Sequence, residues 1–214
     1  MICFNNIFKA YEKPVFSDFG MCLNEGVTTS LLGPSGGGKT TLINMLLGFE
    51  KPDKGSILGI ENKSFSVVFQ EDRLLENFTV KENIMVSSND ESLCSKVLEL
   101  LGMQNTADLY INELSGGMKR RAAIGRCLLK NADIYIFDEP FKGIDEALKK
   151  NIINSMKKYL KGKTCFLVTH DIDEAILMSD YIKIMNKNPV EIIKDVSVNE
   201  IDSKFIEDFK NGIL

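Results

Sequence analysis

The stretch VTTSLLGPSGGGKTTLINMLLG, residues 27–48, decides the fold of this chain. An apolar run over residues 27–32 leads into a glycine-rich loop, and apolar residues at helical spacing follow from Thr40 to Gly48. The loop, residues 33–40, fits the pattern G-x-x-x-x-G-K-[ST] in the strand–loop–helix context that the pattern requires. Its backbone can curl so that successive N–H groups point at phosphate oxygens, and the following helix adds its positive end. The sequence therefore predicts a phosphate-binding loop.

Two side chains at the end of this loop suit a nucleoside triphosphate. The ammonium group of Lys39 can reach the β- and γ-phosphates, and the hydroxyl group of Thr40 can bind Mg²⁺. The loop residues that we expect to bind the nucleotide are Gly33, Pro34, Ser35, Gly36, Gly37, Gly38, Lys39, Thr40 and Thr41.

A second segment, IYIFDEP at residues 134–140, places two carboxylates at the end of an apolar strand. Asp138 can hold Mg²⁺ through a water molecule. Neighbouring residues at a strand end point in different directions, so Glu139 can face the γ-phosphate and polarise an attacking water. Taken alone, the segment could be an acidic turn closed by Pro140; the phosphate-binding loop favours the catalytic interpretation.

The composition is that of a folded, water-soluble protein. Of the 214 residues, 44% are hydrophobic and 26% are charged, and 26 basic against 30 acidic residues give a net charge of -4. This balance argues against a protein that binds nucleic acid through a basic surface. The chain has neither a run of about 18 apolar residues nor a signal-peptide pattern, so we expect it to stay in the cytosol.

The five cysteines are scattered and form no CxxC pair. We expect neither a disulfide framework nor a zinc site, and interpret them as small apolar residues. They are Cys3, Cys22, Cys94, Cys127 and Cys165.

The order of predicted elements divides the chain into three parts. Up to Gln70, strands are predicted at residues 2–11, 19–24 and 27–32 and twice within 55–70. Apolar residues at three- and four-residue spacing then predict helices, with the helical block taken as about 71–130. From about 131 to 214, two apolar runs flank a helical segment, which implies parallel strands joined by a right-handed crossover. The second run ends at His170, so this histidine and the two carboxylates all lie at carboxyl ends of strands, where ligands bind in such sheets.

Between the two phosphate-site segments stands LSGGMKRR, residues 114–121, at the start of a predicted helix. Here the chain resembles the ATP-binding subunit of an ABC transporter, and the resemblance extends from about Cys3 to Met185. It implies a single α/β domain: a P-loop NTPase core with a mainly parallel sheet, an N-terminal antiparallel β lobe and an inserted helical subdomain. It also implies an Mg²⁺-dependent ATPase with ATP as its ligand.

The resemblance assigns roles to matching residues. Ser115, Gly116 and Gly117 would cap the γ-phosphate of ATP held by the opposite subunit of a head-to-tail dimer. As a helix start, these residues form a sound anion site, although they could also be a simple N-cap. Asp145 resembles the aspartate that contacts the opposite subunit, and it too is a good N-cap for the next helix.

Three further residues take family roles. Gln70 would reach Mg²⁺ and the attacking water and link the helical subdomain to a permease. His170, the only histidine, would hydrogen-bond the γ-phosphate. Tyr11 would stack on the adenine, and its alternative is a strand aromatic that packs locally.

The chain departs from the family pattern in two places. Met118 replaces a common glutamine, which should leave the anion cap intact, and KGID at 142–145 replaces a loop of smaller residues. The stretches at 68–84 and 168–180 look most like importers of the nitrate, sulfonate and taurine group. Leu74, Leu75 and Phe78 are expected to line part of a groove for a permease helix, or alternatively to be core residues.

The leading hypothesis is therefore a peripheral subunit on the cytoplasmic side of the cell membrane that powers transport of a small solute, in the direction of import. Its expected partners are a second copy or a related subunit, an integral permease and a solute-binding protein, and no nucleic acid. The alternative is a soluble ABC-type ATPase not coupled to transport, but the DNA-repair kind needs long coiled-coil insertions and the translation kind carries two cassettes. A non-hydrolysing sensor would not need Glu139 and His170, and a kinase would not need LSGG.

Overall fold

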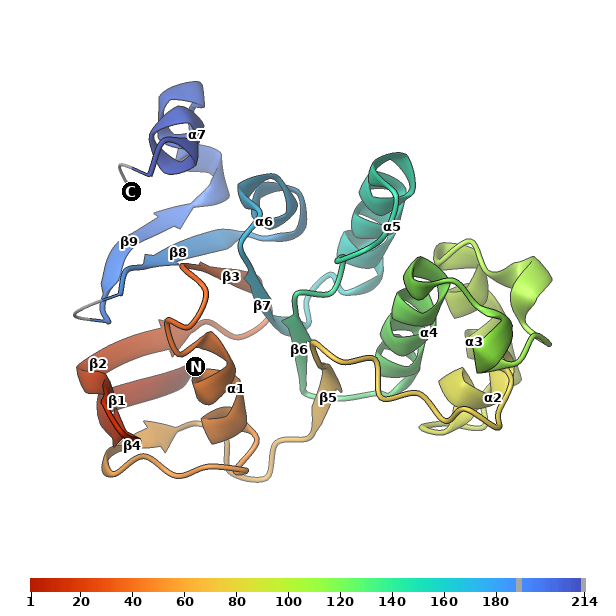
Figure 1. Ribbon diagram of the computed structural model, residues 1–214, viewed down its shortest axis with the longest axis horizontal. Helices are drawn as coiled ribbons and strands as arrows, with labels where there is room; N and C mark the ends of the chain where they lie inside the picture. The colour runs from red at the N-terminus through yellow and green to blue at the C-terminus, as the bar shows by residue number, and fades with distance from the viewer. Residues whose placement is uncertain (188–189, 213–214) are drawn as a thin grey trace.

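The computed structural model describes residues 1–187 and 190–212, and it divides their strands between two sheets (Figure 1). The strands are β1 (Ile2–Ala10), β2 (Pro14–Leu23), β3 (Thr28–Leu32), β4 (Lys54–Leu58), β5 (Phe65–Val68), β6 (Ile134–Asp138), β7 (Thr164–Thr169), β8 (Tyr181–Met185) and β9 (Ile192–Ser197). The helices are α1 (Lys39–Leu46), α2 (Val80–Met85), α3 (Glu91–Leu100), α4 (Gly116–Leu129), α5 (Glu146–Tyr159), α6 (Ile172–Met178) and α7 (Ser203–Lys210). Short 3₁₀ turns cover Gln104–Thr106, Ile111–Glu113 and Val198–Glu200.

The larger sheet has the strand order β5-β6-β7-β3-β8-β9. Its first five strands are parallel and β9 is antiparallel to β8. The predicted strands 27–32, 134–138 and 164–169 are thus neighbours at the centre of the sheet. The expected fold class, an α/β P-loop core with a mainly parallel sheet, is confirmed.

Both faces of this sheet are covered, which explains why its strands are continuous apolar runs. Along β6, Ile134 and Ile136 pack with α1 and the smaller sheet, whereas Tyr135 and Phe137 pack with the helices α3, α4 and α5. The alternation is the two-residue period of a strand. Because the parallel strands end at one edge, the loops after β3, β6 and β7 are brought together there (Figure 1).

The smaller sheet, of order β2-β1-β4, is antiparallel. Strand β2 begins at Pro14, five residues before the strand predicted at 19–24. The first half of β2 was not predicted because it contains Pro14 and Asp18, and proline and aspartate are both depleted in strands. Asp18 has a φ of 60° at an irregularity of the ladder, where its carboxylate accepts a 2.7 Å hydrogen bond from the side chain of Asn6.

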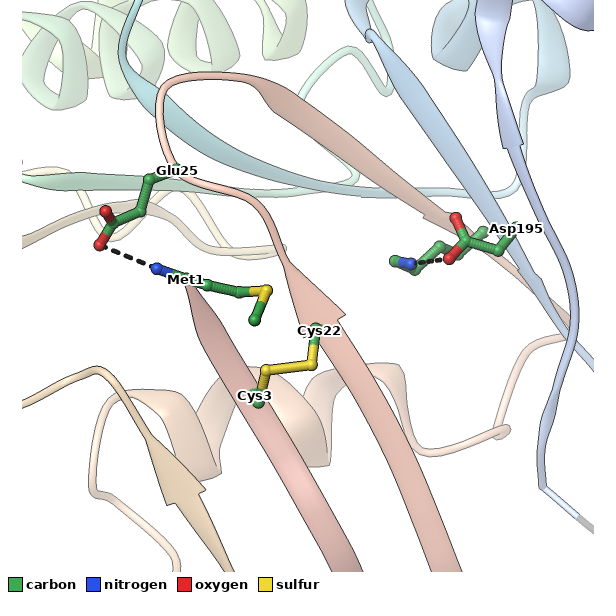
Figure 2. The surroundings of a disulfide bond; sticks show 6 residues. Met1, Cys3, Cys22, Glu25 and Asp195 are labelled. Carbon is green, nitrogen blue, oxygen red and sulfur yellow. Dashed lines mark hydrogen bonds and ion pairs between the residues drawn. A yellow bond between two sulfur atoms is a disulfide. The ribbon is translucent and has the colours of Figure 1, made fainter.

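The expectation that all five cysteines are unpaired is wrong. Cys3 and Cys22 are partners in the β1–β2 ladder, with Cα atoms 4.1 Å apart, and form a disulfide bond (Figure 2). The register of the ladder places them together, and no local sequence pattern reports that register. Cys94, Cys127 and Cys165 are free and buried, as small apolar residues would be.

The chain between β5 and β6 contains α2, α3 and α4, which lie together at one end of the molecule (Figure 1). Helix α2 starts with a capping box in which Thr79 and Glu82 bond each other's backbone. Among the described residues, no helix is both long and apolar enough to cross a membrane.

Candidate nucleotide-binding site

The glycine-rich loop has the backbone geometry that a phosphate cradle requires. Gly36 and Gly38 have φ values of 72° and 88°. At Gly38, the residue before α1, a Cβ atom would also lie 2.6 Å from the ring of Phe16. Only glycine fits this position, where the chain turns from β3 into the positive end of α1.

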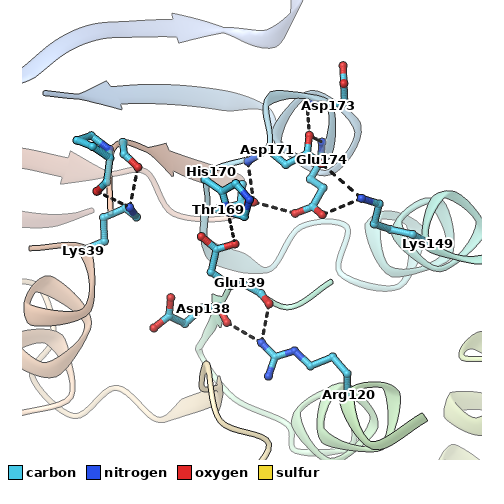
Figure 3. A network of polar contacts seen from close by, with 12 residues as sticks. Lys39, Arg120, Asp138, Glu139, Lys149, Thr169, His170, Asp171, Asp173 and Glu174 are labelled. Carbon is cyan, nitrogen blue, oxygen red and sulfur yellow. Dashed lines mark hydrogen bonds and ion pairs between the residues drawn. The ribbon is translucent and has the colours of Figure 1, made fainter. Parts of the chain in front are cut away.

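Lys39 folds back over the loop (Figure 3). Its Nζ atom donates hydrogen bonds to the carbonyl oxygens of Gly33, at 2.7 Å, and Pro34, at 2.9 Å. Burial lowers the pKa of Lys39, and the negative charges of Glu139 and Asp138 oppose that change. The two hydrogen bonds hold the ammonium group at the loop, near enough to both carboxylates for their charges to act on it.

A cleft of about 290 Å³ joins the loop to the strand ends. Its lining residues are Val15, Ser35, Gly36, Gly38, Lys39, Thr40, Thr41, Gln70, Asp138 and Glu139. All but Val15 were predicted from the sequence. Gly33, Pro34 and Gly37 build the loop backbone, in which the Gly37 N–H donates to the Pro34 carbonyl at 3.1 Å.

One wall of the cleft carries oxygen atoms suited to Mg²⁺. The hydroxyl group of Thr40 lies 3.5 Å from a carboxylate oxygen of Asp138, and Gln70 lines the same cleft. Burial raises the pKa of Asp138, the charge of Glu139 adds to this, and Arg120, Lys39 and the Thr40 hydroxyl oppose it. The neighbouring positive charges thus do not fully offset the burial of the Asp138 carboxylate. Together with the Thr40 hydroxyl and the Gln70 amide, this carboxylate is a suitable set of oxygen ligands for a small divalent cation.

Glu139 points away from Asp138, toward His170 (Figure 3). Its backbone has a φ of 49°, unusual for a non-glycine residue, and its N–H donates to the carbonyl oxygen of Val168 at 2.8 Å. The Nδ1 atom of His170 lies 2.8 Å from a carboxylate oxygen of Glu139, and the imidazole is otherwise open to solvent. Glu139, predicted to polarise the attacking water, and His170, predicted to bind the γ-phosphate, thus contact each other.

Sequence reasoning missed the polar network behind His170. The Thr169 hydroxyl donates to Glu174 at 2.8 Å and accepts the Asp171 N–H at 3.1 Å. Lys149 of α5 donates to Glu174 at 3.1 Å (Figure 3). Burial raises the pKa of Glu174, and the hydrogen bonds from Thr169 and Lys149 oppose the change. This network fixes the backbone on both sides of His170.

The LSGG residues lie outside the cleft. Ser115 caps α4 by accepting the Met118 N–H at 3.4 Å, and Asp145 caps α5. Ser115, Gly116, Gly117, Asp145 and Gln70 line a second pocket of about 670 Å³. The structure therefore brings most of the predicted residues together in two groups, with Gln70 lining both pockets, whereas His170 and Tyr11 are not among the described residues that line either pocket.

Tyr11 is not among the described residues that line the cleft. The residue is 57% exposed, its hydroxyl donates to Glu50, and the Lys9 ammonium lies 5.2 Å from the ring centroid.

The parallel sheet, the phosphate loop and the two carboxylates at the end of β6 define a P-loop nucleoside triphosphatase. Residues 16–142 match the family described as ABC transporter. The chain belongs to this family: it is an ATP-binding subunit of an ABC transporter and an Mg²⁺-dependent ATPase.

Named relatives and a solved structure agree with this assignment. The aliphatic sulfonates import ATP-binding protein of Pseudomonas savastanoi pv. phaseolicola is 35% identical over 189 residues, covering 86% of this chain and 79% of that protein. The taurine import ATP-binding protein of Roseobacter denitrificans is 30% identical over 213 residues, covering 89% and 80%. A dimeric ATP-binding cassette in a post-hydrolysis state, bound to ADP and Pi, superimposes with a TM-score of 0.81 at 25% identity, covering 94% of this chain and 100% of that one.

Proposed function

We propose that this subunit powers the import of a small solute through a separate membrane permease, and that ATP is bound between two subunits. One observation carries the dimer: the phosphate cleft and the pocket at Ser115 are separate in one chain. One chain thus presents two half-sites, and a second copy or a related subunit in head-to-tail arrangement completes both. The similar cassette is itself described as dimeric.

Import and the kind of solute are inferred from the relatives. Proteins named for the import of aliphatic sulfonates and taurine are among them, so the proposed cargo is a small solute of that group. The proposed location is the cytoplasmic side of the membrane, where ATP is available, with a permease and a solute-binding protein as partners.

The side chains of the cleft divide the chemistry among them. Lys39 binds the β- and γ-phosphates, and Thr40, Gln70 and Asp138 hold Mg²⁺, which neutralises phosphate charge when bound. Glu139 accepts a proton from the attacking water, and His170, 2.8 Å from its carboxylate, orients that carboxylate and the γ-phosphate.

Three further roles are part of the proposal. Ser115, Gly116 and Gly117 contact the nucleotide of the opposite subunit, and Asp145 contacts that subunit. Tyr11 stacks on the adenine, for which its exposed side chain offers a ring face.

The permease is proposed to dock on the loop after Gln70, within the helical subdomain of residues 71–130. Leu75 and Phe78 are 41% and 42% exposed, while Leu74 packs against the core. The buried side chain of Asn83 shapes this loop, since it bonds the backbone of Leu75, Phe78 and Thr79. Two apolar side chains thus stand outward on a firmly held loop.

Light scattering after size-exclusion chromatography tests the dimer. A Glu139→Gln variant with MgATP should run as a dimer, because each unhydrolysed nucleotide joins two subunits, and adding Ser115→Arg should abolish it. The control is Glu139→Gln with Lys119→Arg, a substitution on the same helix. A monomer in the presence of tightly bound ATP would contradict the proposal.

Cysteine crosslinking tests the permease contact. A cysteine at position 75 or 78 should crosslink to the copurified permease, whereas one at the distant residue Asn199 should not. If the complex transports its solute but neither position crosslinks, Leu75 and Phe78 do not contact the permease.

A further inference from the structure

Arg120, on the second turn of α4, is a buried cation whose hydrogen bonds reach two loops of the cleft. Its side chain is 4% exposed and its only ion-pair partner among the described residues is Asp72, at 3.0 Å. Its other partners are the carbonyl oxygens of Asp138 (2.7 Å), Glu139 (2.7 Å), Pro140 (2.9 Å), Phe69 (2.6 Å) and Gln70 (3.4 Å).

One arm of the guanidinium fixes the end of β6 (Figure 3). Its Nη2 atom donates to the carbonyl oxygens of Asp138, the last residue of the β6–β7 ladder, and of Glu139, the first residue beyond it. Glu139 adopts a φ of 49°, which a non-glycine residue keeps only when its surroundings hold it. Arg120 supplies that hold, because it bonds the carbonyls on both sides of the Glu139 N–Cα–C unit.

The other arm fixes the loop that carries Gln70. The Nη1 atom donates to Phe69 and Gln70, and it pairs with the Asp72 carboxylate. Arg126, further along α4, donates to the carbonyl oxygens of Asp72 and Arg73. The helix that begins with the LSGG residues therefore holds the Gln70 loop and the carboxylate loop at a fixed spacing.

A planar guanidinium is suited to this task in a way that a lysine is not. It presents five N–H groups in a rigid fork, whereas an ammonium offers three donors at one point. A guanidinium on this helix does not by itself reach the cleft, because the neighbouring Arg121 donates to Leu101 and Gly102, which lie between α3 and α4.

We propose that Arg120 is a positioning residue for ATP hydrolysis, which sets the distance between Gln70 on one wall of the cleft and Asp138 and Glu139 on the other. The inference rests on the roles proposed above for these three residues. Arg120 has no bond to the phosphate loop among the described residues, so it acts on the metal and water side of the site and not on binding of the phosphates.

The test is steady-state ATPase kinetics of Arg120→Lys, which keeps the charge and the pairing with Asp72 but loses the fork. The kcat should fall by about tenfold or more, since a displaced catalytic group costs about this much. The Mg²⁺ concentration for half-maximal activity should rise by about tenfold, as loss of a group that orients metal ligands does. The Kd for ATP in EDTA, measured with a fluorescent analogue, should stay within about twofold of the wild-type value.

Two further variants keep the test decisive. Lys119→Gln removes a charge from the same helix and should leave kcat and the Mg²⁺ dependence unchanged. If Arg120→Lys does not fold, Arg120→Gln combined with Asp72→Asn removes both partners of the ion pair together and should give the same pattern of kcat and Mg²⁺ dependence.

Three results would overturn the proposal: a folded Arg120→Lys with wild-type kcat and Mg²⁺ dependence, an equal loss of ATP affinity in EDTA, or failure of both Arg120 variants to fold, which would make the residue purely structural. A different result is expected if the catalytic role proposed for Glu139 is itself wrong. In that case Glu139→Gln, assayed alongside, would hydrolyse ATP at the wild-type rate.

Discussion

The imidazole Nδ1 of His170 and a carboxylate oxygen of Glu139, 31 residues apart in the chain, lie 2.8 Å from each other across the ends of adjacent strands β6 and β7. This contact aims the Glu139 carboxylate away from Asp138, so the two carboxylates point in different directions, as the roles proposed for them on the attacking water and on Mg²⁺ require. The strained backbone of Glu139 is what turns its side chain in that direction.

Replacing Glu139 with glutamine should slow hydrolysis by about 10²-fold or more and leave binding of ATP and Mg²⁺ intact. The amide keeps the size and one acceptor, but it cannot take a proton from water. Phosphate release measures the rate, and titration with a fluorescent ATP analogue measures binding. Glu76→Gln, an exposed glutamate with no hydrogen bond of its own among the described contacts, serves as the control. A Glu139→Gln protein with wild-type turnover would refute the catalytic role.

Lys39→Ala should reduce the affinity for ATP by about 10²-fold, because the site loses an ammonium group that hydrogen bonds to the Gly33 and Pro34 carbonyls hold at the loop. Equilibrium titration checks this, with Lys81→Ala on the exposed face of α2 as the control. Near-wild-type affinity would mean that the loop does not bind the terminal phosphates.

Gly117→Ala should lower the free energy of unfolding by about 1–3 kcal/mol, because its Cβ would lie 2.7 Å from the Gly143 carbonyl oxygen and push the loop before Asp145. The matched control is Gly116→Ala, where a Cβ meets no atom within 4 Å and stability should change by about 0.5 kcal/mol or less. Urea unfolding of both variants decides the point. Equal losses at the two positions would show that tight packing at Gly117 is not the cause.

Asp138→Asn should make the protein without nucleotide more resistant to heat at neutral pH. Burial, together with the charge of Glu139, raises the pKa of Asp138 above its ordinary value of 3.8, so the folded chain holds this proton more tightly than the unfolded chain does. Stability therefore falls as pH rises from 3.8 through the raised pKa, and the charged carboxylate remains unfavourable above it. The asparagine avoids this cost.

Asp133, the residue before the start of β6, has a pKa shifted in the opposite direction, so its substitution should have the opposite effect on stability. Hydrogen bonds from the side chain and backbone of Ser64 lower its pKa, so its charged form stabilises the fold above the unfolded pKa, and this is lost as pH falls through the lower folded value. Asp133→Asn should therefore lower the melting temperature at neutral pH. Thermal unfolding of both variants between pH 5 and 8, without Mg²⁺, measures the two effects. A lower melting temperature for Asp138→Asn at neutral pH would contradict the first prediction.

The sequence was enough for the parts of the site that are continuous in the chain. The phosphate loop, the carboxylates at the end of β6 and the histidine after β7 follow from local patterns, since a buried strand needs an unbroken apolar run and a phosphate cradle needs glycines at set spacing. Their convergence also followed, because parallel strands of one sheet end at one edge. Family resemblance supplied the roles that these patterns alone left open.

Other parts could not be predicted because they depend on contacts between distant segments. The Cys3–Cys22 bond depends on the register of the β1–β2 ladder. The first half of β2 contains residue types that are rare in regular strands and occur here beside irregularities of the ladder. The Thr169–Glu174–Lys149 network joins α5 to α6 with polar residues that resemble ordinary helix-surface charges in the sequence.

By itself, the sequence determined the phosphate loop, the alternation of strands and helices and the two carboxylates at the end of β6, because each is encoded within a few adjacent residues. Only the tertiary structure decided that Arg120 is buried against two loops, and that Ser115 lies in a different pocket from Lys39. A basic residue in a helix has the same local pattern whether it is solvated or buried. Which of the two occurs depends on where the folded chain places unpaired carbonyl oxygens, and that is fixed by packing and not by spacing.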